Sequence, residues 1–433
     1  MSSTPTSART EQSSLPPAYL EPQAYLRRDE FHRETTYTPS YAPAGSLEPH
    51  TVSYAVAGSL SPSAPVVVWL NGMGGHRLAV TLLDGIFASR GVRLVTLDRP
   101  SAGRSTPVPL RHRLPASHDA LLAVLAAEHV STFSLLSHSN GILYALYTLR
   151  HLPSHLKVRS WALSSPYVPP WLSGSVALSA ARWIPAPLVG QLGTVAGAVQ
   201  RLAGPLERGM GWSSAAVRDW GGWASMGPWS SSSSSSSSAA AAAPPRAAAS
   251  SAAGEEDPEL LPPPKQLARF RRLNAQRPPH KRLFGGFYLP PGFFARGMQV
   301  AIDEGLDSMG QEAMLCLRQG GARWECPGEE EAARGEGGGA VDEGRLYERA
   351  FEGLRDLLRA EGREVEVSVW CGEDDALVPG KGREYLRALL VDRLSMVDPS
   401  RWHEVEDAGH DDTLGLSCVI EPLLDDVQRA HEQ

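Results

Sequence analysis

A serine stands at the centre of the pentapeptide Ser-His-Ser-Asn-Gly, residues 137–141, where the chain is expected to turn sharply. The apolar run Phe133 to Leu136 precedes this pentapeptide and the helix-like run Ile142 to Arg150 follows it. A strand, a tight turn with a serine at its tip and a helix together form a nucleophile elbow, which exposes the hydroxyl beyond the end of a sheet. The pattern alone also fits an ordinary strand-to-helix turn, so Ser139 is a candidate nucleophile that needs partners.

A serine hydroxyl becomes a nucleophile at neutral pH only when a histidine takes its proton and a carboxylate orients that histidine. His410 is the candidate base, because it follows a small-residue turn after an expected strand over Trp402 to Val405. Asp375 is the candidate acid, because it lies in the turn after an expected strand over Val365 to Trp370. The order serine, acid, histidine along the chain is the order that accompanies a nucleophile elbow.

These candidates have plainer interpretations too. Asp375 is crowded by Glu373 and Asp374, which also fits a surface acidic turn. His76 and His138 are alternative bases, but we expect structural roles for both, with the His138 side chain directed away from the serine.

The glycine-rich turn Asn71 to His76 directly follows an apolar strand-like run that ends at Leu70. Glycines allow a backbone to present its N–H groups, and an acyl-transfer site needs two such donors for the developing oxyanion. We expect the amide of Met73 to be one donor and the amide of Asn140, next to the nucleophile, to be the other. A plain strand-to-helix turn is the alternative interpretation.

Strand-like and helix-like patterns alternate from about residue 50. Expected strands cover His50–Ala57, Ala64–Leu70, Val92–Leu97, Phe133–Leu136, Val158–Leu163, Val365–Trp370 and Trp402–Val405, and expected helices cover Leu78–Arg90, His118–Glu128, Gly141–Arg150, Leu346–Ala360, Arg383–Leu390 and Leu414–Arg429. This alternation predicts an α/β fold with a mostly parallel central sheet and helices on both faces. Parallel strands end at one edge of their sheet, which is where such folds place their sites.

The alternation of strand-like and helix-like patterns is interrupted between residues 169 and 340. We therefore expect one α/β core, residues 46–168 plus 341–433, with a large, partly disordered cap insertion at 169–340. Low-complexity loops are expected at about 230–264, which contains an unbroken serine run, and at 328–340, which is rich in glycine and glutamate. The polar, proline-bearing residues 1–45 are expected to be disordered or loosely packed.

At this point the chain resembles the α/β-hydrolase fold superfamily, over residues 50–168 and 341–425. Besides the elbow, the segments that carry the resemblance are Asn71–Gly74, Asp98–Ser105, Gly372–Pro379 and Ala408–His410. The resemblance implies a cap inserted after the strand that ends near Leu163, where the alternation of strands and helices is interrupted.

Two positions depart from the superfamily pattern, which usually has histidine in place of Asn71 and glycine in place of Ser137. Neither change removes a catalytic group. Members with an aspartate nucleophile hydrolyse epoxides or haloalkanes, and Ser139 argues against those chemistries.

Composition narrows the function classes. The 433 residues are 42% hydrophobic and 21% charged with a net charge of −7, so there is no basic excess that favours nucleic-acid binding. The 4 cysteines are too few for a disulfide scaffold, and we expect free thiols. No signal-peptide core and no apolar run of about 18 residues is found, so we expect no transmembrane segment and a cytoplasmic location.

The insertion contains two further features. Aromatic side chains at 284–294 either line a pocket for an apolar acyl chain or form the core of the cap. A basic cluster is either a solvated face or a peripheral contact with an anionic membrane surface or substrate. Its members are Lys265, Arg269, Arg271, Arg272, Arg277, Lys281 and Arg282.

Taken together, these residues predict a serine hydrolase that cleaves a carboxylic ester of a small-molecule substrate with an apolar acyl group, with a thioester or an amide as the lesser option. Ser139 attacks, His410 transfers the proton, Asp375 orients His410, and the amides of Met73 and Asn140 hold the oxyanion. No metal or organic cofactor is implied. An acyltransferase with the same triad and a non-catalytic interaction protein on this fold stay open as alternatives.

Overall fold

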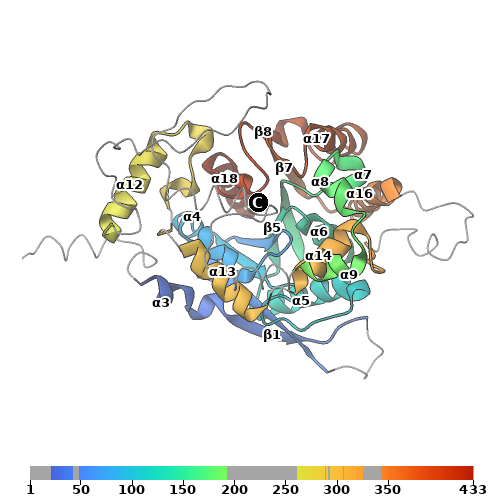
Figure 1. Cartoon of the computed structure of the whole chain (residues 1–433), viewed down its shortest axis with the longest axis horizontal. Coiled ribbons are helices and arrows are strands. Elements are labelled where there is room, and N and C mark those ends of the chain that lie inside the picture. Colours follow the sequence, from blue (N-terminus) through green and yellow to red (C-terminus); the bar gives the residue numbers. More distant parts are fainter. Residues whose placement is uncertain are drawn as a thin grey trace, which may run out of the picture.

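An eight-stranded sheet forms the centre of the computed structural model, which describes residues 21–41, 48–192, 261–287, 289–290, 293–305, 307–324 and 343–432 (Figure 1). Its strands are β1 (Arg33–Tyr37), β2 (His50–Gly58), β3 (Val66–Leu70), β4 (Arg93–Leu97), β5 (Thr132–His138), β6 (Lys157–Ser164), β7 (Glu366–Gly372) and β8 (Trp402–Val405). They lie in the order β1-β2-β4-β3-β5-β6-β7-β8. The β1–β2 and β2–β4 pairs are antiparallel and the others are parallel, so the predicted fold class is confirmed.

Helices surround this sheet. The α-helices are α3 (Pro22–Leu26), α4 (Asp84–Ser89), α5 (Arg113–Ala127), α6 (Gly141–His151), α7 (Pro170–Ser173), α8 (Val176–Ala181), α9 (Ala186–Gly190), α12 (Pro263–Ala275), α13 (Phe293–Glu304), α14 (Ser308–Leu317), α16 (Glu343–Ala360), α17 (Gly380–Arg387) and α18 (Ser417–Glu432). Short 3₁₀ segments are η1 (Asp29–Phe31), η2 (Arg77–Leu82), η3 (Leu110–His112), η6 (Pro279–Lys281), η7 (Phe284–Gly286), η9 (Pro399–Arg401) and η10 (Asp412–Leu414), and a π-helical turn, η8 (Ala388–Arg393), extends α17.

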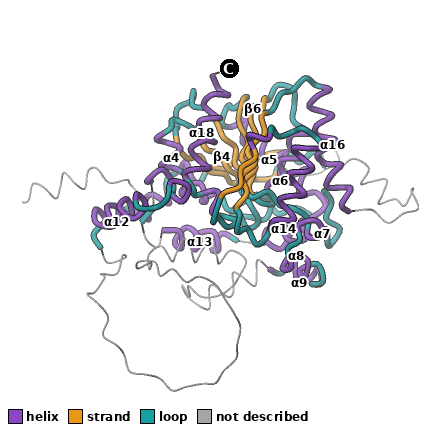
Figure 2. Tube along the Cα trace, turned by 90° about the horizontal axis from the view of Figure 1, so that it is seen from above, coloured by secondary structure: helices purple, strands orange, loops and turns teal. Residues whose placement is uncertain are grey.

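Both faces of the sheet are covered, and strand β3 shows how. All five of its residues are buried. Val66, Val68 and Leu70 pack into the core shared with α5, α6 and α16, while Val67 and Trp69 pack into the core shared with α4 and α18. Successive strand side chains point to opposite faces, so an unbroken apolar run is what a doubly covered strand requires. Figure 2 shows the sheet edge-on between these two helix layers.

The insertion begins after β6 and ends before β7, which are neighbours in the sheet. In Figure 2 its helices α13, α14 and α7–α9 lie at the same end of the strands, with α14 close to α9 and α13 apart from them. The low-complexity stretch at 328–340 lies outside the described residues, as does 230–264 except for residues 261–264, where α12 begins. None of the described helices combines the length and the hydrophobicity that a transmembrane span needs.

Residues 21–41 differ from the expectation of a disordered or loosely packed segment. Strand β1 pairs with β2 as the edge of the sheet, and the Phe31 side chain is fully buried. The Tyr25 ring lies 5.6 Å from the ring of Phe293 in the insertion. A few apolar anchors in a polar segment suffice to hold it on the core, and composition averages hide them. Residues 1–20 and 42–47 lie outside the described residues.

One expected helix is divided. The apolar spacing over 78–90 predicts a single helix, but the chain forms η2 and then the separate helix α4. His76 caps the start of η2, because its ring accepts from the amide of Leu78, and the Arg77 guanidinium donates to the buried Asp98 carboxylate at 2.6 Å. These contacts accompany a 3₁₀ geometry over Arg77–Leu82, and the α-helix begins only at Asp84.

Candidate active site

Ser139 lies in the sharp turn between β5 and α6, and its backbone has a φ of 51°. A positive φ is uncommon for a residue with a side chain and stores strain, which a functional turn can retain. A Cβ on Gly141 would lie 2.2 Å from the carbonyl oxygen of Leu70, so only glycine fits there. Ser137, at the first position of the turn, is buried, and its Oγ accepts a 2.9 Å hydrogen bond from the Trp161 indole.

The structure brings the three candidate side chains together. Nε2 of His410 lies 2.8 Å from Oγ of Ser139, and Nδ1 of His410 lies 2.7 Å from Oδ2 of Asp375. The other oxygen of Asp375 accepts hydrogen bonds of 2.8 and 2.9 Å from the amides of Leu377 and Val378. The Asp375 carboxylate therefore has one oxygen fixed by the backbone and the other directed at the imidazole.

Two loops at the ends of β7 and β8 hold the acid and the base. The amide of Asp374 donates to the carbonyl of Ala408 at 2.9 Å, which ties one loop to the other. A Cβ on Gly372 would lie 2.3 Å from that same carbonyl oxygen. Glycine at this position therefore lets the loop that carries His410 pass directly over the end of β7. Glu373 and Asp374 are exposed, whereas Asp375 is 2% exposed.

Burial and neighbouring charges shift the pKa values of His410 and Asp375. Burial alone would lower the pKa of His410, but the charge of Asp375, the hydrogen bond to it and the charge of Asp411 raise this pKa above its usual value. Burial would raise the pKa of Asp375, but the charge and hydrogen bond of His410 and two backbone amides lower it. The arrangement thus favours an ionised carboxylate and an imidazole that gains a proton readily.

The glycine-rich turn at 71–76 adjoins the serine. A Cβ on Gly72 would lie 3.3 Å from Cβ of Ser139, and the amide of Gly75 donates to the carbonyl of Gly72 at 3.1 Å. Among the residues that the structure describes, the backbone amides of Met73 and Asn140 have no hydrogen-bond acceptor. Both amides are thus left as donors near the nucleophile.

The two other histidines have their own partners. Nε2 of His138 lies 2.9 Å from Oδ1 of Asp411, and Nδ1 lies 3.2 Å from Oγ of Ser164. His76 is 5% exposed, and its Nε2 lies 3.1 Å from Oε2 of Glu304. Sequence reasoning did not single out Asp411, although it directly follows His410. Its position beside the candidate base was the available signal.

Among the described residues, two groups of side chains have the residue types of a metal site, and neither fits one. The donors of His138, His410 and Asp411 lie within 4.8 Å of one another, but both nitrogens of His410 already have partners. His76 forms a similar group with Asp98 and Glu304. The guanidinium of Arg77 lies 2.6 Å from both of these carboxylates and supplies the positive charge between them.

The aromatic residues of the insertion are divided between the core and the surface. Phe284 and Phe293 are buried in the cluster shared with α4 and α18, whereas Phe287 is 39% exposed. The structure does not describe Tyr288, nor the side chain of Phe294. In the basic cluster, Lys281 pairs with Asp407 at 2.5 Å. Four of the cluster's side chains are exposed: Lys265, Arg271, Arg272 and Arg282.

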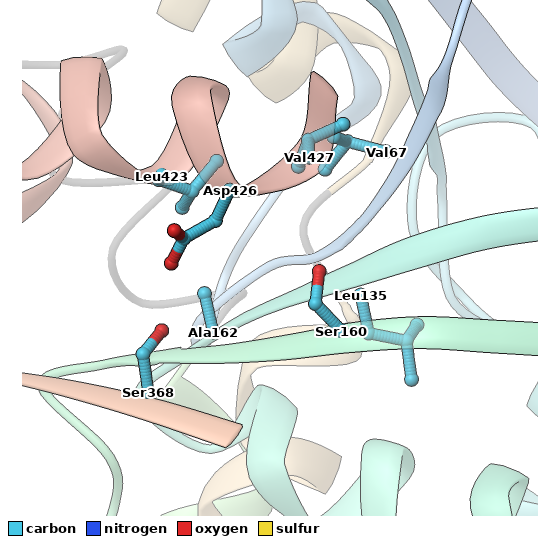
Figure 3. A pocket seen from close by; sticks show the side chains of 8 residues that line it. All are labelled: Val67, Leu135, Ser160, Ala162, Ser368, Leu423, Asp426 and Val427. Atoms are coloured by element: carbon cyan, nitrogen blue, oxygen red, sulfur yellow. The ribbon is translucent and has the colours of Figure 1, made fainter. Parts of the chain in front are cut away.

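A small cavity lies elsewhere in the fold. It measures about 10 Å³ and lies between the sheet and α18 (Figure 3). Ser160 on β6, Ser368 on β7 and Asp426 on α18 face it. Ser139 and its partners are not among the residues that line it, so this cavity does not serve the candidate site.

Comparisons with known proteins concern the fold alone. No protein-family model and no curated protein matches the sequence. Epoxide hydrolase I of potato (Solanum tuberosum) is similar at a TM-score of 0.48 and 12% identity, over 92% of this chain and 99% of that one. An epoxide hydrolase mutant of Vigna radiata is similar at a TM-score of 0.46 and 14% identity, and the match covers 94% of this chain and 99% of that one. An esterase from a Rhodococcus species is similar at a TM-score of 0.43 and 14% identity, and the match covers 93% of this chain and 98% of that one.

Proposed function

We propose, from the premise that this chain has the α/β-hydrolase fold, that it is a serine hydrolase that cleaves a carboxylic ester through an acyl-enzyme. The observation that carries the proposal is the unbroken hydrogen-bond chain from Oγ of Ser139 through His410 to Asp375, with distances of 2.8 and 2.7 Å. A nucleophile, a base and an orienting carboxylate within hydrogen-bond reach are what acyl transfer by serine requires.

In the first half of the reaction, Ser139 Oγ attacks the ester carbonyl carbon while its proton passes to Nε2 of His410. Nδ1–H of His410 donates to Asp375, so that Nε2 is the free acceptor. The carbonyl electron pair moves onto oxygen, where the amides of Met73 and Asn140 stabilise the negative charge. The C–O bond of the ester then breaks, and the leaving alcohol takes the proton from His410.

In the second half, a water molecule attacks the acyl-enzyme while His410 removes one of its protons. The second tetrahedral intermediate breaks its bond to Oγ, and His410 returns the proton to Ser139. The products are a carboxylic acid and an alcohol, and the enzyme is restored without any cofactor.

The nucleophile type favours ester chemistry over epoxide opening. A carboxylate that opens an epoxide forms an ester, which water can hydrolyse. A serine that opened an epoxide would form an ether, which the same machinery does not cleave. Ser139 therefore fits an acyl substrate, and a thioester or an amide would react through the same steps.

The finer predictions are part of this proposal. We propose a small acyl substrate of apolar character and a cytoplasmic location, and the exposed part of the basic cluster leaves a peripheral membrane contact open. An acyltransferase would use the same residues with an alcohol or a thiol in place of water. A non-catalytic interaction protein on this fold would keep the hydrogen bonds among Ser139, His410 and Asp375 but would turn over no substrate.

The test is hydrolysis of p-nitrophenyl esters of graded acyl length by the wild type and by Ser139→Ala. We expect turnover by the wild type that falls at least about 10³-fold in the variant. The matched control is Ser160→Ala, because Ser160 is a buried serine whose Oγ donates to Ser134 away from His410. A competing alcohol in the assay separates hydrolysis from acyl transfer by its products. Equal turnover by the wild type and Ser139→Ala would refute the proposal.

A further inference from the structure

Arg99, just after β4, contacts three separate parts of the site. It is 4% exposed, and its guanidinium donates to the backbone carbonyl of Gly72 and, at 3.3 Å, to Oδ1 of Asn140. Its Nε lies 3.2 Å from Oε1 of Glu312 on α14. One side chain thus links the glycine-rich turn, the residue after the nucleophile and a helix of the insertion.

The contact with Gly72 concerns the peptide unit that carries the first proposed oxyanion donor. The carbonyl of Gly72 and the N–H of Met73 belong to one planar trans peptide and point in opposite directions. The carbonyl accepts from Arg99 and, at 3.1 Å, from the amide of Gly75. Holding this carbonyl therefore holds the direction of the Met73 N–H. A cationic donor on the carbonyl also polarises the peptide, which strengthens its N–H as a donor.

The side chain of Asn140, whose amide is the second proposed donor, is held on both of its ends. Its Oδ1 accepts from Arg99, and its Nδ2 donates to Oε2 of Glu312 at 2.6 Å. Asn140 is 1% exposed. A side chain with both ends bonded to buried charged partners cannot turn without breaking a charge-assisted hydrogen bond, so the backbone at this position is restrained too.

Glu312 makes the insertion part of this arrangement. It is fully buried on α14, and it also accepts from Nε of Arg113 at 2.9 Å and from the hydroxyl of Tyr144 at 2.8 Å. Burial would raise the pKa of the Glu312 carboxyl, but the charges of Arg113 and Arg99 hold it below its usual value. Its negative charge is therefore present when α14 lies on the core.

We propose that Arg99 is a positioning residue that orients both donors of the oxyanion hole, and that Glu312 of the insertion holds Arg99 in place. Docking of α14 on the core thereby completes the oxyanion hole, because the carboxylate that fixes Arg99 and Asn140 comes from α14. This inference rests on the proposed function, since it assigns a role only if an oxyanion forms at Ser139.

The test compares Arg99→Lys, Arg99→Met and Glu312→Gln with the wild type on its best p-nitrophenyl ester. Active sites are counted by complete reaction with a fluorophosphonate, so that unfolded protein does not enter kcat. Lysine cannot donate to three partners in the fork geometry of arginine. Because a donor is misdirected and not deleted, we expect kcat to fall about 10-fold for lysine and about 100-fold for methionine. The glutamine variant keeps a side-chain oxygen and nitrogen, and we expect a loss of about 5-fold.

Two inhibitors separate positioning from general damage. An alkylboronic acid forms a tetrahedral adduct with the serine and needs the oxyanion hole, whereas an ether isostere of the ester does not. We expect the affinity for the boronic acid to fall in proportion to kcat/KM, while KM and the affinity for the ether stay within twofold. A role limited to folding would change the number of titrated sites and leave kcat per site intact.

Glu304→Gln is the matched control, because Glu304 is also an insertion carboxylate paired with a core arginine, Arg77, but contacts neither Gly72 nor Asn140. We expect its kcat per site to stay within twofold. The inference is overturned if Arg99→Lys and Glu312→Gln keep wild-type kcat per site, if boronic acid affinity is unchanged, or if Glu304→Gln loses as much. If the wild type itself neither turns over esters nor reacts with the fluorophosphonate, the proposed function fails and this inference falls with it. An active wild type with unaffected variants refutes the inference alone.

Discussion

Replacing Asp375 by asparagine should remove most of the activity while leaving the site intact in shape. Oδ1 of Asp375 accepts from the amides of Leu377 and Val378 at 2.8 and 2.9 Å, so an asparagine must keep its oxygen there. Its NH₂ group then faces Nδ1 of His410, where the carboxylate oxygen lay at 2.7 Å. An N–H donor at this place forces Nδ1 to be the acceptor and puts the imidazole proton on Nε2.

The wrong tautomer blocks the first step. With a proton on Nε2, His410 donates to Ser139 and cannot accept its proton. The loss for this kind of change is about 10⁴-fold in kcat, which corresponds to about 5.4 kcal/mol of lost transition-state stabilisation. KM should change little, because no side chain that binds the substrate in this account is altered.

The assay is the steady-state hydrolysis of the best p-nitrophenyl ester, with circular dichroism to verify folding. Asp374→Asn is the control, since Asp374 is the exposed neighbour of Asp375 in the same acidic turn, and we expect it to keep full activity. If Asp375→Asn loses less than about 10-fold in kcat, or if Asp374→Asn loses as much, the reasoning about the tautomer is wrong.

Further predictions follow from the neighbouring contacts. His410 accepts a proton only when it is neutral, and the charge of Asp411 helps to raise the pKa of His410. Asp411→Asn should therefore move the acidic limb of the pH profile of kcat/KM to lower pH. An acidic limb that stays in place or moves to higher pH would contradict this expectation. Glu304→Gln should lower the free energy of unfolding by about 2 kcal/mol at pH 7 in urea titrations. Because the pKa of Glu304 is depressed in the folded protein, this difference should close as the pH falls below 4.5; a constant difference contradicts it. Gly141→Ala places a Cβ 2.2 Å from the carbonyl oxygen of Leu70 and should cost about 2 kcal/mol in thermal unfolding and at least about 10-fold in kcat. The control Gly297→Ala has only Leu26 near its Cβ, at 3.9 Å, and should be neutral or stabilising by up to about 1 kcal/mol.

The sheet was predictable from sequence because its signals are local. The expected strand over Trp402 to Val405 coincides with β8, and the apolar run that ends at Leu70 became β3. Strand β1 was missed, because its polar sequence lies at the edge of the sheet and buries little, so it lacks the hydrophobic pattern that marks a central strand.

The candidate site was predictable only in part. Residue order and the ends of expected strands pointed to Ser139, Asp375 and His410, and the structure places them within hydrogen-bond distance. The ion pair between Arg99 and Glu312 gave no signal, because it joins residues far apart in the chain through an insertion helix. Such a contact depends on how the insertion folds back onto the core, which no local periodicity encodes.

Reaction of the purified chain with a fluorophosphonate, followed by mass spectrometry of its peptides, tests directly whether Ser139 is an activated nucleophile. We expect one phosphonyl group per chain, attached to Ser139, with no adduct in Ser139→Ala and a much slower reaction in His410→Ala. Folded protein that acquires no adduct, or that carries it on a different serine, would contradict this role of Ser139.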